Sequence, residues 1–351
     1  MQRLALLCAL ALTLAACDST GPDDGPVTGV YVLNQGAFGN DASGGVTVYD
    51  PETGSAGAFA APGGLVQSGV VREGRLYLLV NFSDSFSSGR GRLDVIDVET
   101  GQTVQQIDVG TPRGIAFTDD ETAFVTDLYG AAVTPVDLAT GTAGTPIPVG
   151  DNPEGIAASG GRLFVANSGF GTGSTLSVIR ADSREVTETV DLDCENPNEV
   201  VADARGRIAV VCLGRSDFAT GEVVAPARVL LLDAATLAVR EDALFLGETF
   251  GSALGQDAAY DAEANALYVL AGSDEVLRLF LSSEREAETI AIAENNASGV
   301  GFADGRLYVA RLDEANPFSD DGSVTVHDPE GALLDTFEAG VVPSAFAFAR
   351  D

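Results

Sequence analysis

The sequence contains no lysine and a single histidine, His327, among its 351 residues. A zinc site built from several histidines is therefore excluded, and a Ser-His-Asp catalytic set could form only around that one side chain. His327 stands in a predicted hairpin strand beside Asp328, where we expect a solvated surface side chain rather than a general base. We therefore expect a protein that binds rather than catalyses, with no catalytic residue, no metal site and no cofactor.

Positive charge is also scarce, because 52 acidic residues stand against 19 arginines and give a formal net charge of −33. A surface of this sign repels the phosphate backbone, which excludes nucleic acid as the expected partner. Two interpretations of the acidity stay open. The surface is typical of the acidic, strongly solvated proteins of salt-adapted (halophilic) organisms, or it attracts cationic ligands or divalent ions.

Long apolar runs are confined to the N-terminal segment, and none of the later ones approaches the ~18 residues of a spanning helix. Residues 1–16 combine Arg3 with the apolar stretch Leu4–Leu14, which predicts a signal peptide. The segment leads into Leu14-Ala15-Ala16-Cys17, which resembles the bacterial lipoprotein box, in which the cysteine is lipidated after cleavage. The alternative is an ordinary secretory peptide with an incidental cysteine. We expect an exported protein whose residues 17–28, lipidated Cys17 and a flexible tether, anchor it to a membrane, at the outer membrane or cell surface.

Two cysteines remain for the folded part of the chain, Cys194 and Cys212. An even pair in an oxidising compartment is a candidate disulfide, and the repeats place both residues at the same end of neighbouring strands. Two buried free thiols are the alternative, since a sequence does not give the separation of the Cα atoms.

A strand followed by Asp-x-x-Thr-Gly, or a degenerate form of it, recurs seven times at intervals of 40 to 53 residues. The clearest copies end at Gly54, Gly101 and Gly141. The motif suits a hairpin turn, because the Asp side chain caps the turn and the glycine adopts a positive φ. The interval is that of a four-stranded blade, so the sequence predicts an all-β, seven-bladed β-propeller over residues 29–351.

A second element precedes most copies and consists of a strand of small residues, a short turn and a hydrophobic strand. The blades converge at the small-residue strand, where larger side chains would clash. The chain ends in one such inner strand, residues 343–348, and begins after the tether with residues 30–34, a second strand with no inner strand before it. We expect the C-terminal strand to pair into the first blade and close the ring.

The hydrophobic strands carry a recognisable pattern, as in Phe124-Val125-Thr126-Asp127 and Phe164-Val165-Ala166-Asn167. They resemble the Tyr-Val-Thr-Asn repeat of the YncE-like propellers over roughly residues 29 to 351. The opening residues 30–36 and the segment 165–169 resemble the surface-lipoprotein branch of that family, common in the Bacteroidetes and their relatives. That branch includes lipoproteins that capture cobalamin and pass it to a TonB-dependent transporter, so the resemblance implies cobalamin as one candidate ligand.

The two faces of the predicted ring differ. The tight-turn face carries the turns between first and second strands and the Asp-x-x-Thr-Gly hairpins, which offer little surface. The long-loop face carries the connections from second to third strands, and binding usually resides on long loops of a rigid scaffold. These long connections are residues 34–45, 81–92, 167–175, 213–228 and 311–323.

Candidate ligand-binding residues lie on the long-loop face in two groups. One consists of aromatic residues in the loops, each of which either contacts a ligand or folds inward to pin its own loop: Phe38, Phe82, Phe86, Tyr129, Phe170, Phe218 and Phe318. The other consists of polar residues at the starts of inner strands, which either meet a ligand with amide groups at the channel mouth or cap their own strands: Arg113, Glu154, Asn198 and Gln256.

These observations favour an envelope binding protein that captures a small molecule, possibly cobalamin or a related nutrient, for a transporter. A protein-interaction scaffold in the envelope is the alternative, since the aromatic loops would suit another protein equally well. A calcium-dependent lactonase-type hydrolase is a further alternative, because it needs only Glu, Asp and Asn around the channel.

Overall fold

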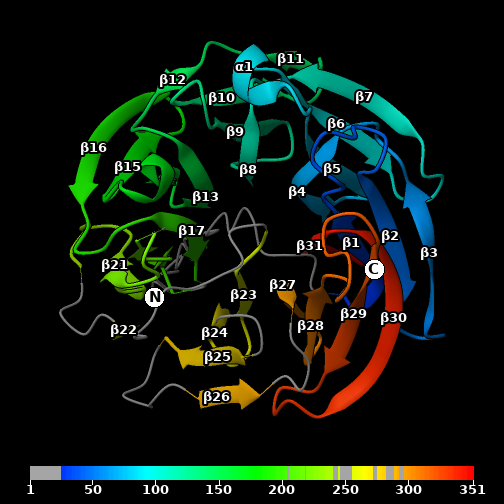
Figure 1. The fold of residues 1–351 in the computed structure, drawn as a ribbon. Helices are drawn as coiled ribbons and strands as arrows, with labels where there is room; N and C mark the ends of the chain where they lie inside the picture. Colours follow the sequence, from blue (N-terminus) through cyan, green and yellow to red (C-terminus); the bar gives the residue numbers. More distant parts are fainter. Residues whose placement is uncertain are drawn as a thin grey trace, which may run out of the picture.

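The computed structural model describes residues 25–203, 205–217, 219–239, 244–245, 255–271, 275–281, 288–291 and 296–351. Within them, seven antiparallel sheets stand as blades around one axis (Figure 1). The predicted all-β, seven-bladed propeller is confirmed. Helical structure in the described part of the chain consists of α1 (Ser85–Ser88) and the short 3-10 turn η1 (Gly169–Gly171), neither long enough to span a membrane. The predicted leader, Cys17 and residues 18–24 of the tether lie outside the described residues.

Each blade has an inner strand beside the axis and further strands stacked outward. The first four blades, from inner to outer strand, are: β31 (Pro343–Arg350), β1 (Val27–Asn34), β2 (Gly45–Asp50), β3 (Ser55–Ala60); β4 (Leu65–Arg72), β5 (Arg75–Asn81), β6 (Gly91–Asp97), β7 (Thr103–Asp108); β8 (Pro112–Phe117), β9 (Thr122–Asp127), β10 (Ala132–Asp137), with β11 (Thr142–Ala143) and β12 (Ile147–Pro148) both on β10; and β13 (Pro153–Ser159), β14 (Arg162–Asn167), β15 (Thr175–Arg180), β16 (Glu185–Asp191).

The last three blades follow the same order. They are: β17 (Pro197–Ala202), β18 (Arg207–Cys212), β21 (Arg228–Asp233), β22 (Leu244–Phe245); β23 (Ala258–Asp261), β24 (Ala266–Ala271), β25 (Glu275–Phe280), β26 (Glu288–Ala291); and β27 (Ala297–Ala303), β28 (Arg306–Arg311), β29 (Asp321–His327), β30 (Leu333–Val341). A separate hairpin of β19 (Arg215–Ser216) and β20 (Val223–Ala225) rises from the loop between β18 and β21.

The ring closes within blade one, where β31 pairs with β1 in antiparallel register. Val30 lies opposite Phe348 and Val32 opposite Phe346. The first and last strands of the propeller thus share one sheet, as predicted. β1 begins at Val27, two residues before the boundary expected at residue 29.

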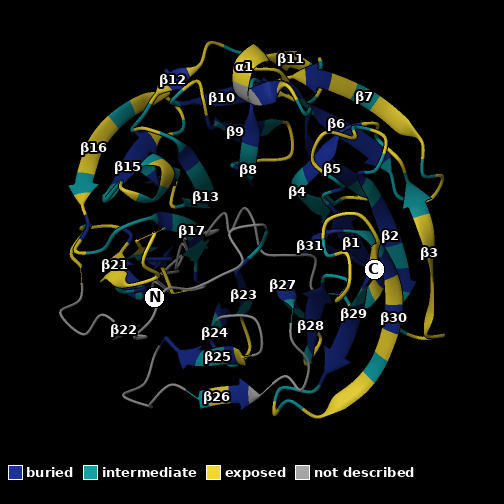
Figure 2. Cartoon of the chain, in the orientation of Figure 1, coloured by how far each residue is buried: buried dark blue, intermediate teal, exposed yellow. Residues whose placement is uncertain are grey.

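The core of the described chain is divided among the interfaces between blades. Second strands bury both faces, and successive side chains point to opposite neighbours. Val30 and Val32 pack toward blade seven, whereas Tyr31 and Leu33 pack toward blade two. Full burial of such a side chain contributes roughly 1.5–3 kcal/mol. Inner and second strands are therefore largely buried, while the outer strands β3, β7, β16 and β30 show exposed positions (Figure 2).

The Asp-x-x-Thr-Gly turns close the hairpins between third and fourth strands. Asp50 Oδ1 accepts the N–H groups of Glu52 and Thr53 at 2.8 and 3.1 Å, and Gly54 has a φ of 71°. The side-chain cap and the positive φ predicted for this motif are thus both present. A further copy, from Asp217 to Gly221, forms the turn of the β19–β20 hairpin and was missed in the seven-fold repeat.

Cys194 and Cys212 form a disulfide, with their Cα atoms 6.1 Å apart. Cys194 lies in the connection before β17, and Cys212 is the last residue of β18. Cys212 is fully buried in the core between blades four and five, so the bond ties the entry of blade five to its second strand.

His327 is buried, with 3% of its surface exposed, so the expectation of a solvated side chain is wrong. Its Nδ1 lies 3.1 Å from the Gly331 carbonyl oxygen, and its Nε2 lies 2.9 Å from Thr325 Oγ1. β29 lies between β28 and β30, and residues 324–327 are all buried, so both faces of this strand are covered and His327 shares the buried face of Thr325.

Candidate functional site

A cavity of about 1500 Å³ occupies the axis of the propeller, walled by the inner strands. Small residues let these strands converge. A Cβ on Gly114 would meet the Glu154 carbonyl oxygen at 2.8 Å, and one on Gly301 would meet Phe346 Cβ at 2.8 Å. Close approach of backbones is a principal use of glycine in strands, and here it draws the blades together around the axis.

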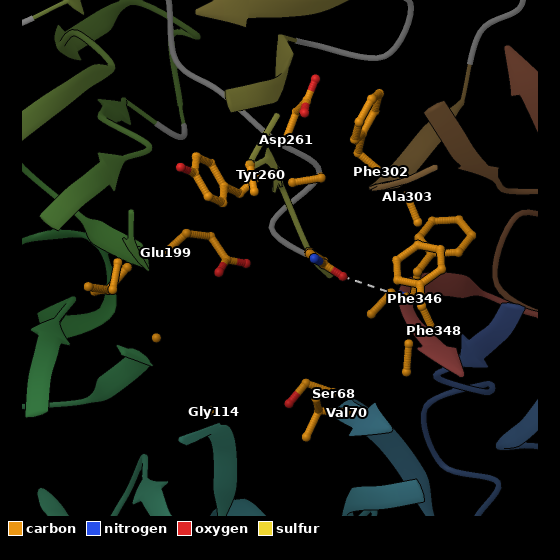
Figure 3. Close-up of a pocket in the computed structure, with 18 of the residues that line it drawn as sticks. Ser68, Val70, Gly114, Glu199, Tyr260, Asp261, Phe302, Ala303, Phe346 and Phe348 are labelled. Atoms are coloured by element: carbon orange, nitrogen blue, oxygen red, sulfur yellow. Dashed lines mark hydrogen bonds between the residues drawn. The ribbon is translucent and has the colours of Figure 1, made fainter. Parts of the chain in front are cut away.

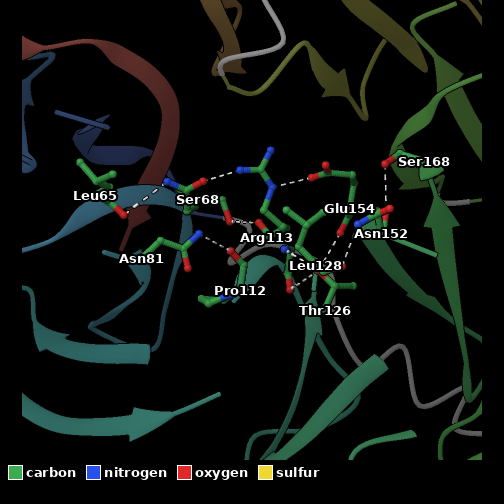
Figure 4. Close-up of polar contacts among 12 residues, drawn as sticks. Leu65, Ser68, Asn81, Pro112, Arg113, Thr126, Leu128, Asn152, Glu154 and Ser168 are labelled. Atoms are coloured by element: carbon green, nitrogen blue, oxygen red, sulfur yellow. Dashed lines mark hydrogen bonds and ion pairs between the residues drawn. The ribbon is translucent and has the colours of Figure 1, made fainter. Parts of the chain in front are cut away.

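The polar end of the cavity lies toward the long-loop face and centres on Arg113. Its Nε donates to Glu154 Oε2 at 2.6 Å, and its Nη1 donates to Gln67 Oε1, so the guanidinium links the inner strands of blades two, three and four (Figure 4). Burial alone would lower the pKa of Arg113, but the charge of Glu154 outweighs it and raises the pKa. The guanidinium is therefore held in place by side chains from both neighbouring blades.

Hydroxyl groups of an inner strand and of a second strand hold the same inner strands in place. Thr126 Oγ1 donates to the Glu154 carbonyl oxygen at 2.7 Å and accepts the Gly114 N–H at 2.8 Å (Figure 4). Ser68 Oγ donates to the Arg113 carbonyl oxygen at 2.6 Å. Because the bonds from Thr126 to Glu154 and from Ser68 to Arg113 cross from blade to blade, the side chains that line the cavity stand on a rigid frame.

Glu199, on β17, projects its carboxylate into the cavity (Figure 3). Burial raises its pKa to about 8, with the nearby Asp257 carboxylate adding to the effect, although the Asp257 backbone N–H donates a hydrogen bond to it. Within the described residues it has no ion-pair partner. Glu199 is therefore largely protonated at neutral pH and ready to ionise beside a cation.

The two predicted amide residues also line the cavity. Gln256 Oε1 accepts the Phe346 N–H at 3.2 Å, and its Nε2 donates to the Ala258 carbonyl oxygen at 3.2 Å. Gln256 thus ties blade six to β31 across the wall. Asn198 lies beside Glu199 at the start of β17.

Aromatic rings form the opposite part of the wall, toward blades six, seven and one. Phe302, Phe346 and Phe348 are grouped on one side of the cavity, with Tyr260 nearer Glu199 (Figure 3). The rings of Phe346 and Phe348 are nearly parallel, with centroids 6.5 Å apart. The cavity therefore combines polar groups at one end with an aromatic wall.

The cavity extends to the tight-turn face. Its lining includes turn residues of three blades, among them Gly160, Glu263 and Gly305. The turns themselves are short, as expected, but the opening that they surround makes this face a route to the site. The axial cavity is therefore reached from the tight-turn face as well as from the face of the long loops.

Aromatic residues of the long loops fall into three groups. Phe38, Tyr129, Phe170 and Phe318 are exposed by 81, 42, 63 and 57%. Phe82 is half-buried, with the guanidinium carbons of Arg90 and Arg92 each 5.1 Å from its ring centroid, so it serves its own loop. The side chain of Phe86 and the whole of Phe218 lie outside the described residues.

Tyr129 and Phe170 bring two loops together, since their ring centroids are 5.7 Å apart. Phe170 has a φ of 51°, in the left-handed region that costs a bulky residue of order 1–3 kcal/mol. That backbone holds the ring outward on the loop between β14 and β15. None of the four exposed aromatic residues lines the axial cavity.

Sequence reasoning brought Arg113, Glu154, Asn198 and Gln256 to one place, but missed Glu199 and the aromatic wall. The aligned repeats did single out Glu199. The preceding two inner strands carry glycine at the corresponding position, Gly114 and Gly155, so a glutamate there departs from the repeat. Among the described residues, no group of three or more His, Cys, Asp or Glu side chains is placed to hold a metal ion.

No protein-family profile and no curated protein matches this sequence. Solved structures do match. Hydrazine synthase of Kuenenia stuttgartiensis superposes with a TM-score of 0.63 at 14% identity, over 82% of this chain and 88% of that one. The likeness is one of fold. A chain of a nidogen/laminin complex (TM-score 0.52, 15% identity, 92% and 97% covered) and the computationally designed Ika8 protein (0.55, 12%, 89% and 93%) are similar in the same sense.

Proposed function

We propose that this chain is an exported, lipid-anchored binding protein of the cell envelope that holds a small molecule in its axial cavity. The observation that carries the proposal is the cavity itself, about 1500 Å³ in volume, with charged and amide side chains at one end and aromatic rings along its wall. Large concave sites with a few convergent polar groups are the usual form of a ligand pocket. The lipid anchor rests on Cys17 and the leader before it.

Cobalamin is the first ligand to test, because the chain resembles the YncE-like surface lipoproteins. Its amide groups would find donors and acceptors in Arg113, Asn198 and Gln256. In this role the protein would pass the vitamin to an envelope transporter. Binding without catalysis agrees with the position of His327, buried among its own hydrogen bonds and absent from the cavity lining.

The test uses the chain without residues 1–17, since all seven sheets lie between Val27 and Arg350. Mixed with cobalamin and gel-filtered, it should elute with the red chromophore at one equivalent. Val70→Trp, which places an indole in the cavity wall, should abolish retention. Val104→Trp, on the exposed outer strand of the same blade, is the matched control and should retain the vitamin. Retention by Val70→Trp, or none by the unmodified chain, would count against cobalamin capture in the cavity.

A scaffold role in the envelope is the second candidate, favoured by the exposed rings of Phe38, Phe170 and Phe318 on the long-loop face. Exposed aromatic residues are enriched at protein interfaces. A scaffold retains no chromophore, so the same assay separates the two functions.

A further inference from the structure

The charges that line the axial cavity are unevenly balanced. Each of its three arginines is already engaged: Arg113 by Glu154, Arg350 by Asp304 at 2.7 Å, and Arg278 by Glu288 and Glu330, both at 3.8 Å. Arg278 also lies over the rings of Tyr268 and Phe280. Every arginine that lines the described part of the cavity is thus already paired with a carboxylate.

The carboxylates differ. Glu154 and Asp304 are held by arginines, Asp203 pairs with Arg207, and Asp261 accepts the N–H groups of its own turn. Glu263, the remaining described lining carboxylate, is an exposed turn residue, whereas Glu199 points into the space without an ion pair or a turn to cap. Its hydrogen bond from the Asp257 backbone leaves further lone pairs for a ligand.

The wall that faces Glu199 is apolar and aromatic. Phe302, Phe346 and Phe348 lie across the cavity from its carboxylate (Figure 3). Aromatic faces attract cations as well as apolar groups, so this wall suits the body of a ligand whose positive group lies at Glu199. An anionic ligand would meet an apolar wall and an unpaired carboxylate.

We propose that the cavity binds an amphipathic organic cation, with its positive group at Glu199 and its apolar body against Phe302, Phe346 and Phe348. The proposal rests on the proposed function in one respect, that the axial cavity is the binding site, and it does not depend on cobalamin. The net charge of −33 raises the concentration of cations near the surface and so favours their encounter with the cavity.

Calorimetric titration of the chain without residues 1–17 tests this class with three probes of similar shape: benzyltrimethylammonium, 2-phenylethanol and 3-phenylpropionate. At pH 8.5 the cation should bind at least tenfold more tightly than the alcohol, and the anion more weakly still. Glu199→Gln should weaken binding of the cation about tenfold and leave the alcohol within about twofold. Glu195→Gln is the matched control, because that carboxylate pairs with Arg215 outside the cavity.

The pH dependence supplies a second measurement. Benzyltrimethylammonium keeps its charge at every pH, so any change reports on the protein. Glu199, near Arg113, Glu154 and Asp257, must lose its proton to pair with the cation, and its pKa is about 8. Affinity for the cation should therefore rise about tenfold or more from pH 6.5 to 8.5, with no such rise for the alcohol or for Glu199→Gln.

Equal affinity for cation and alcohol, tightest binding of the anion, or an unaltered cation affinity in Glu199→Gln would each overturn the proposal. If none of the probes binds while cobalamin is retained in a manner sensitive to Val70→Trp, the ligand class is wrong and the proposed function stands. If the cation binds as expected while cobalamin does not, the binding function stands with a different ligand.

Discussion

Glu199 occupies a position at which three other inner strands carry glycine, namely Gly114, Gly155 and Gly299. In those blades the absence of a side chain lets the backbone of the next inner strand approach closely. In blade five the strand instead carries a carboxyl group into the axial space, away from bulk water and near Asp257. A side chain with an unfavourable charged state in a cavity is a feature that functional sites retain.

Glu199 should make stability depend on pH in an unusual direction. Burial raises its pKa from 4.5 to about 8, so between these values the folded chain binds more protons than the unfolded chain. The free energy of unfolding should then fall as pH rises through that window, by an amount on the order of a few kcal/mol. Glu199→Gln should lack this decline, measured by chemical denaturation at pH 5 and pH 8.5. Glu195→Gln should keep it, and parallel curves for Glu199→Gln and the unmodified chain would contradict the assignment.

Residue-level prediction succeeded where the repeat fixes a position and failed where the local backbone departs from it. Arg113 and Glu154 start successive inner strands, so alignment of the repeats alone brought them to one end of the axis. His327 was misplaced because β29 is covered on both faces, so no residue near the end of this strand faces solvent as a half-exposed hairpin strand would allow. Phe346 and Phe348 were recognised as strand residues, but which side chains line a cavity depends on the rotation of each blade.

At the scale of elements, the hairpins with an Asp-x-x-Thr-Gly turn were the most predictable part of the chain. Within these five residues the Asp side chain caps the turn and the glycine adopts a positive φ. Hydrogen bonds from Thr100 and Thr140 hold the pKa of Asp97 and of Asp137 below the usual range, as expected of carboxylates that cap a turn. The β19–β20 hairpin was not foreseen, since its Asp-x-x-Thr-Gly turn interrupts the period of the repeat. The loops between second and third strands were correctly located. Whether the aromatic side chains in these loops face solvent or pack inward depends on the loop backbone, which the repeat pattern does not specify.

The disulfide should contribute measurably to stability at this scale. Cys194 and Cys212 are separated by 18 positions, and closing a loop of this length in the unfolded chain is worth about 3 kcal/mol. Cys194→Ala with Cys212→Ala should lower the free energy of unfolding by about that amount in denaturant titrations. Reductant should destabilise the unmodified chain similarly and leave the double variant unchanged. An unmodified chain that is insensitive to reductant would show that the bond constrains little.

At the scale of the whole molecule, the closure of the ring was predicted because each end of the chain lacked what the other supplied. Removal of residues 341–351 takes β31 from blade one and leaves β1 as an open edge beside the cavity. We expect loss of the single cooperative unfolding transition and a tendency to associate through the open edge, seen in denaturant titration and gel filtration. Removal of Asp351 alone is the control and should change neither. A truncated chain that unfolds at the same denaturant midpoint would show that the ring does not depend on this strand.

Blade one also determines where the polypeptide leaves the propeller. β1 runs from Val27, beside Arg350, to Asn34, so its first residue lies on the same side as Gly160 and Gly305 at the cavity opening. If Cys17 carries a lipid, ten residues connect it to β1, and a segment of this length spans no more than about 35 Å when fully extended. The cavity opening at the tight-turn face would then lie toward the lipid headgroups. Compounds adsorbed at the bilayer surface would reach this opening more readily than compounds that approach from the long-loop face.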